Sequence, residues 1–123
     1  MAELIKRVGP PKATDLKGDE FTWTIQLSAA PSREWSRIFS EPAESTVLCH
    51  PRRLGIMHQA IVFKADEGHL PTWVQYIDKW IVGANKGMEE QEEAERQRKV
   101  QALAEEEARQ KRIREVNDKF RNL

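Results

Sequence analysis

Residues 70–88, LPTWVQYIDKWIVGANKGM, decide the fold because one apolar stripe runs through them. Large apolar side chains recur there at intervals of three and four residues, which places them on one face of an α-helix. Pro71 falls in the first turn, where a missing backbone N–H costs nothing. We therefore expect the main core helix here, with this buried stripe: Leu70, Trp73, Val74, Ile77, Trp80, Ile81 and Ala84.

Two glycines, Gly83 and Gly87, lie near the end of this helix. Each glycine costs about 1 kcal/mol in a helix interior relative to alanine. They indicate either a hinge or a weak point within one continuous helix. Continuity is favoured because the apolar stripe reaches Met88.

Residues 89–123, called the arm here, contain no proline or glycine. Acidic residues stand four positions before basic ones, which is the favourable orientation for helical pairs worth about 0.2–0.5 kcal/mol each. We therefore expect the arm to be a long charged helix. The expected pairs are Glu92 with Arg96, Glu95 with Lys99, Glu105 with Arg109, Glu107 with Lys111, and Glu115 with Lys119.

The clearest strand upstream is 20–28, where Phe21, Trp23, Ile25 and Leu27 alternate with polar residues. Such a period of two predicts one buried and one open face. Residues 3–8 could form a short edge strand. The Gly-Pro-Pro run at 9–11 should stop it, so the segment to Asp19 is interpreted as a polar linker.

A short helix and a hairpin are expected between residues 31 and 64. Pro31 and Ser32 suit a helix start, and Trp35, Ile38 and Phe39 share one face. Residues 46–52 and 57–64 are interpreted as strands joined near residues 54–55. A turn there would set Leu48 near Ile61 and His50 near Gln59.

These elements predict an α+β fold: a small antiparallel sheet of three or four strands with two helices on one face, ferredoxin-like in outline, plus the long charged C-terminal helix. The expected division is a small domain at 1–88 and the arm at 89–123. The apolar stripe favours an arm that continues the second core helix without a break. No family resemblance is evident, and fold-level similarity carries no function.

Composition excludes several classes of function. Lysine plus arginine and aspartate plus glutamate both number 20, so the net charge of zero argues against a general attraction to nucleic acid or acidic membranes. The single cysteine suits a reducing compartment, and neither a signal peptide nor a membrane span is evident. A cytoplasmic protein is expected.

Few residues could carry chemistry. Cys49, His50, His58 and His69 are the candidates for a metal site or a nucleophile, but they lack paired metal-ligand spacings. Cys49 in the middle of a strand is expected to be a buried thiol. There is no glycine-rich phosphate loop and no hydrolase motif. We therefore expect no enzyme, no cofactor and no small-molecule substrate.

The favoured hypothesis is a non-enzymatic interaction or assembly protein that binds another protein, or a second copy of itself, through the arm. The expected contact is Ile113, Val116, Phe120 and Leu123, which are spaced by three, four and three residues; we call them the terminal patch. Arg112, Arg114 and Glu115 would set orientation. Carried backwards, this spacing meets charged residues, so a long parallel coiled coil is not expected.

The charge distribution within the arm leaves two further options open. Residues 89–108 have a net charge of −5 and residues 109–123 have a net charge of +4, so two arms could pair antiparallel. The alternative function is nucleic-acid binding as an accessory protein. It would use the basic residues Arg52, Arg53, Arg109 and Lys111.

Overall fold

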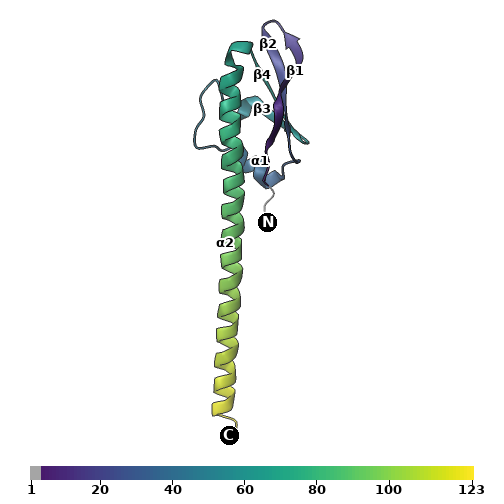
Figure 1. Ribbon diagram of the computed structural model, residues 1–123. Helices are drawn as coiled ribbons and strands as arrows, with labels where there is room; N and C mark the ends of the chain where they lie inside the picture. The colour runs from purple at the N-terminus through teal and green to yellow at the C-terminus, as the bar shows by residue number, and fades with distance from the viewer. Residues whose placement is uncertain (1–3) are drawn as a thin grey trace. The chain divides into compact units, whose positions relative to one another are not determined.

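The computed structural model describes residues 4–123, and the chain divides into two compact units, one ending at Glu89 and the other spanning Glu90–Leu123. The first unit contains a four-stranded sheet beside the first turns of a long helix (Figure 1). The elements in order are β1 (Arg7–Lys17), β2 (Glu20–Leu27), α1 (Arg33–Phe39), η1 (Pro51–Arg53), β3 (Leu54–Met57), β4 (Ala60–Ala65), η2 (Glu67–His69) and α2 (Leu70–Lys119).

The sheet is antiparallel throughout, in the order β1-β2-β4-β3. The α+β class and the small antiparallel sheet are therefore confirmed. β2 and β3 are both antiparallel to β4, which lies between them, so the connection through α1 forms a split βαβ unit. The element order ββαββα nevertheless differs from the βαββαβ order of ferredoxin-like folds.

Alternation in β2 positions its side chains as expected. Ile25 and Leu27 are buried, and Phe21 and Trp23 are half-buried on the same face. Ile25 pairs with Ile61 of β4, and Trp23 pairs with Phe63, so apolar side chains of neighbouring strands share one face. This face forms one side of the core.

The predicted linker between residues 9 and 19 is wrong, because β1 runs through most of it from Arg7 to Lys17. Two register shifts interrupt its pairing with β2, and Gly9, with a φ of 72°, lies within the first of them, between Val8 and Lys12. β1 is an edge strand, where prolines without an N–H are tolerated. Of the predicted strand 3–8, residue Glu3 lies outside the described residues, and the strand begins only at Arg7.

The predicted hairpin is also wrong in its first strand and its turn. β3 and β4 are joined at His58, which has a φ of 54°, and Met57 pairs with Ala60. Ile61 faces Ile56 rather than Leu48. Residues 46–52 form no strand because local bonds close a turn: the N–H of Thr46 donates to the carbonyl of Cys49 at 3.0 Å.

α1 begins as expected, since Ser32 caps it and its hydroxyl accepts a hydrogen bond from the N–H of Trp35. The predicted pair of helices on one face is not matched. There is one long helix, α2, and α1 is a seven-residue helix that follows β2. Its apolar side chains meet α2: Phe39 packs edge-on against Trp80 at 5.9 Å. Two turns offer too few buried positions to form a second layer.

α2 continues without interruption from Leu70 to Lys119, so neither glycine is a hinge. Its buried residues are Trp73, Ile77, Trp80, Ile81 and Ala84, which confirms most of the predicted stripe. Gly87 has a packing role, because a Cβ added there would lie 2.8 Å from Cγ2 of Ile38 on α1. No helix among residues 4–123 carries an apolar stretch long enough to cross a membrane.

Candidate interaction surface

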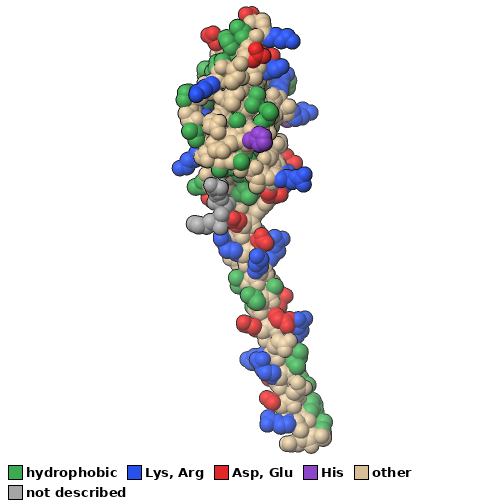
Figure 2. Space-filling view, turned by 90° about the vertical axis from the view of Figure 1, so that its right-hand side faces the viewer, with side chains coloured by type: hydrophobic (Ala, Val, Ile, Leu, Met, Phe, Trp, Pro, Cys, Tyr) green, Lys and Arg blue, Asp and Glu red, His purple; other side chains and the backbone are tan. Residues whose placement is uncertain are grey.

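The arm makes no core of its own. None of the residues 89–123 is buried; Glu92 and Glu106 are half-buried, and the others are exposed. Figure 2 shows charged side chains of both signs along this segment, with hydrophobic groups at its end. Most helices in proteins are stabilised by packing an apolar face against the rest of the protein. The arm buries no such face, so its helix relies on local side-chain pairs.

Ion pairs form along the arm, but most of them join residues three positions apart rather than the expected four. Glu95 pairs with Lys99 as predicted, at 3.7 Å. Arg96 pairs with Glu93 instead, and Arg109 pairs with Glu106. The pKa of Glu93 is lowered by hydrogen bonds from Gln97 and Arg96. These contacts are exposed to solvent, so each stabilises the helix only weakly, and less so in salt.

The pairs of Glu107 with Lys111 and of Glu115 with Lys119 do not form in this structure. Instead, Glu115 lies 3.7 Å from Arg112, and Lys119 stands over the ring of Phe120 at 5.6 Å. Pairing at intervals of three and of four places partners on the same helical face, so spacing alone does not choose between them.

The terminal patch lies on the last turns of α2 and just beyond it. Ile113, Val116, Phe120 and Leu123 are 46%, 36%, 50% and 99% exposed. The backbone N–H of Phe120 still donates to the carbonyl of Val116 at 3.2 Å, so the helical turn extends past Lys119. Ile113, Val116 and Phe120 therefore lie along one face of the helix.

The charged residues expected beside the patch differ in their surroundings. Arg112 and Glu115 form the ion pair noted above, so they are linked to each other across one turn. Arg114 forms no ion pair within the described part of the chain. An unpaired cation next to an apolar patch is available to an acidic group on a partner.

Of the basic residues in the nucleic-acid alternative, Arg52 and Arg53 lie in η1. They border a surface hollow of about 690 Å³, which is lined by Ser45, Thr46, Val47, His50, Arg52 and Arg53. In the arm, Arg109 is already paired with Glu106, while Lys111 has no such partner among the described residues. The outer face of β2 carries Thr22, Thr24 and Gln26, with no aromatic ring on which a base could stack.

Cys49 is buried, as expected, but in a loop rather than a strand. Burial raises the pKa of its thiol, which disfavours the reactive thiolate. His50 accepts a hydrogen bond from the N–H of Arg52, and His69 lies 2.5 Å from Asp66. No hydrogen bond of these histidines reaches Cys49. Residues 4–123 contain no group of three or more His, Cys, Asp and Glu side chains that could hold a metal ion.

Two polar features of the domain escaped the sequence analysis. The side chain of Asn85 on α2 accepts hydrogen bonds from the indole of Trp35 at 2.9 Å and from the N–H of Ile5 at 3.1 Å, and it donates to the carbonyl of Ile5 at 2.8 Å. Its position within the predicted helix was evident, but its partners are 50 and 80 residues away. Only the fold brings them together.

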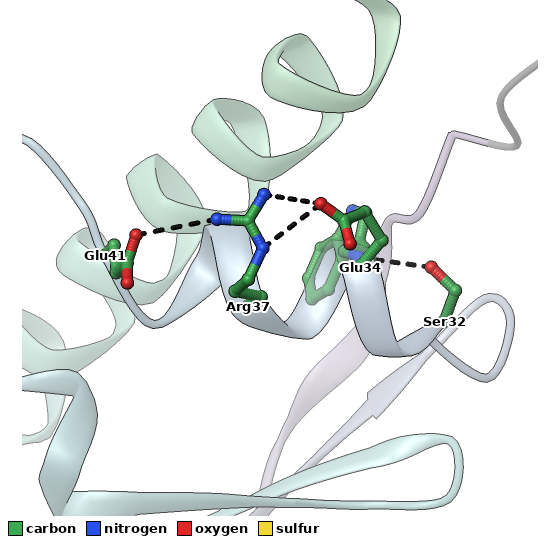
Figure 3. Close-up of polar contacts among 5 residues, drawn as sticks. Ser32, Glu34, Arg37 and Glu41 are labelled. Atoms are coloured by element: carbon green, nitrogen blue, oxygen red, sulfur yellow. Dashed lines mark hydrogen bonds and ion pairs between the residues drawn. The ribbon is translucent and has the colours of Figure 1, made fainter. Parts of the chain in front are cut away.

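The second feature lies on the exposed side of α1, where Arg37 bonds to Glu34 and lies 3.8 Å from Glu41 (Figure 3). The hydrogen bond to Glu34 raises the pKa of Arg37. Both partners stand three or four residues from Arg37, so the spacing was a usable signal. The contacts stabilise a short helix locally and form no enclosed site.

No family model, curated protein or solved structure matches this chain, so the candidate surface is judged on its chemistry alone.

Proposed function

We propose that this chain is a non-enzymatic interaction or assembly protein that binds another protein chain through the terminal patch. The observation that supports the proposal is an apolar patch, regularly spaced and exposed, at the end of a charged helix in which none of the residues 89–123 is buried. Fully burying an aliphatic or aromatic side chain contributes roughly 1.5–3 kcal/mol, so four such residues offer substantial binding energy.

The spacing of the patch fits a known mode of recognition. Ile113, Val116 and Phe120 stand at positions i, i+3 and i+7, the pattern by which one face of a helix enters an apolar groove. Arg112, Arg114 and Glu115 lie beside that face. They would set the direction of docking rather than supply most of the affinity, because exposed charges mainly control orientation and association rate.

The test compares two double variants of the full chain. Val116→Ser with Phe120→Ser removes the patch, whereas Val100→Ser with Leu103→Ser removes a more exposed apolar pair elsewhere on the same helix. Proteins cross-linked to each immobilised variant are quantified by mass spectrometry. Circular dichroism establishes equal helix content.

A protein retained by the wild type and by the Val100/Leu103 variant, but lost from the Val116/Phe120 variant, is the expected result. The proposal fails if the same proteins are captured at the same levels by both double variants.

A further inference from the structure

The order of charges within residues 90–114 of the arm is complementary to its own reverse. We infer that two copies of this chain pair through antiparallel arms centred on Ala102. Residues equally far from Ala102, on opposite sides, then lie at the same level. Within residues 90–114, wherever two charges lie at the same level they are of opposite sign: Glu90 with Arg114, Glu92 with Arg112, Glu93 with Lys111, Glu95 with Arg109, Arg98 with Glu106, and Lys99 with Glu105.

The two-fold symmetry of such a pair brings each of these opposite charges to the same level twice. The in-register parallel pair behaves in the opposite way, because every residue lies beside its own copy. Glu93 would then face Glu93, and Lys111 would face Lys111. Like charges held close together cost binding energy, so the charge order favours the antiparallel orientation.

One helical face is suited to this contact. Val100 and Leu103 lie next to the centre and are 63% and 65% exposed, so they are the large apolar residues available there. Steps of three and four residues along the same face lead to Arg96 on one side and Glu107 on the other. In the antiparallel pair Val100 lies within one residue of the level of Leu103 of the second copy, so the two can pack together, and Arg96 lies within one residue of the level of Glu107.

Several charges on or beside this face are available for the pairing. Glu107, Lys111 and Arg114 form no ion pair within the described part of their own chain. Glu93 and Arg96 are bonded only to near neighbours on the exposed helix surface, and such contacts exchange at little cost. The small apolar centre and the charged flanks predict an association that weakens as salt increases.

This face is distinct from the terminal patch. Val116 follows Val100 by sixteen residues, which at 3.6 residues per turn places the two about 160° apart around the helix. The inference rests on the proposed function only in treating the arm as the contact surface. Self-pairing leaves the terminal patch free for a different protein.

Orientation and register are tested with nitroxide labels on the full chain, in a Cys49→Ala background. A label at Gln101→Cys lies near the centre, so the two labels of an antiparallel pair are separated by little more than the 8–10 Å between helix axes, and their spectra broaden. A label at Asn117→Cys lies thirty residues from its level on the second copy, or about 45 Å at 1.5 Å per residue. Short distances at both positions would indicate a parallel pair and overturn the inference.

Charge reversal provides the second test. Glu90→Lys with Glu93→Lys, and separately Lys111→Glu with Arg114→Glu, should each weaken self-association at low salt by at least about tenfold in sedimentation velocity. An equimolar mixture of the two should restore a dimer. A monomeric wild type at low salt, or a mixture that does not associate, overturns the inference.

The two proposals fail separately. Val100→Ser with Leu103→Ser should abolish self-pairing while keeping capture of the partner protein. Val116→Ser with Phe120→Ser should do the reverse. If self-pairing is lost in the Val116/Phe120 variant but retained in the Val100/Leu103 variant, the assigned face is wrong.

Discussion

Adding one methyl group at Gly87 tests the close approach of α1 to α2. A Cβ at this position would lie 2.8 Å from Cγ2, 3.3 Å from Cδ1 and 3.7 Å from Cγ1 of Ile38. Cγ2 is attached to the branched Cβ of isoleucine, whose χ1 is stiff in a helix, so it cannot simply rotate away. Gly87→Ala therefore forces a shift between the two helices or within Ile38.

The magnitude follows from two opposing terms. Alanine in place of glycine in a helix interior stabilises by about 1 kcal/mol. Forcing an extra methyl into a packed contact costs about 1–3 kcal/mol. The expected net effect of Gly87→Ala is a destabilisation of about 1 kcal/mol. Gly83 is the matched control, since a Cβ there meets nothing within 4 Å, so Gly83→Ala should stabilise by about 1 kcal/mol.

Tryptophan fluorescence during urea and thermal unfolding is the appropriate assay. All four tryptophans precede residue 89, so the signal reports on the domain rather than on the arm. For a domain of this size, about 1 kcal/mol corresponds to a change in Tm of about 4–8 °C. Gly87→Ala should lower Tm and Gly83→Ala should raise it.

A compensating change makes the test specific to the contact. Ile38→Leu removes the methyl group on Cβ, so Gly87→Ala should be less harmful, or stabilising, in that background. The double-mutant cycle then shows a favourable interaction energy between the two positions. If Gly87→Ala stabilises the wild type as much as Gly83→Ala does, the packing argument is refuted.

Two further predictions concern the domain interior. Asn85→Leu leaves the buried indole N–H of Trp35 without its acceptor, which should lower the unfolding free energy by about 1–3 kcal/mol in urea titration, while equal stability would show that the bond contributes nothing. The pKa of the Cys49 thiol is raised by burial, so the native protein should react slowly with iodoacetamide at pH 8 and rapidly in urea. Because Cys49 is neutral in the folded protein, its contribution to stability is complete below the thiol pKa of the unfolded chain, about 8.5. This contribution is lost as the pH rises above that value. Cys49→Ala should therefore remove this part of the pH dependence of stability.

Parts of the fold follow from local patterns. The helical spacing in 70–84, the alternation of β2 and the cap at Ser32 each depend on residues close in sequence, and each is present in the structure. The long charged helix is likewise evident from the absence of helix breakers after Gly87. Ion-pair partners within it were less predictable, because neighbouring acidic residues compete for the same base.

The misplaced elements depend on distant partners. The Gly-Pro-Pro run in β1 resembles a linker, but pairing with β2 holds it as an edge strand with two register shifts. Residues 46–52 contain apolar side chains typical of a strand. The hydroxyl of Thr46 and the backbone of Cys49 bond to each other instead, and the turn moves to His58.

The candidate surface shows the same division. The spacing of the terminal patch and the reversed order of charges about Ala102 are properties of the sequence, because a helix converts position directly into direction. The exposure of Val100, Leu103 and the patch is a property of the tertiary structure, since it depends on whether any other part of the chain covers them.

The sequence by itself therefore determined the helices, the alternating strand and the charge pattern of the arm, which arise from interactions over a few residues. The tertiary structure alone decided the sheet order, the packing of Gly87 on Ile38 and the three bonds of Asn85. These contacts join residues far apart in the chain. Their energies depend on which surfaces are brought together, and no local periodicity encodes that.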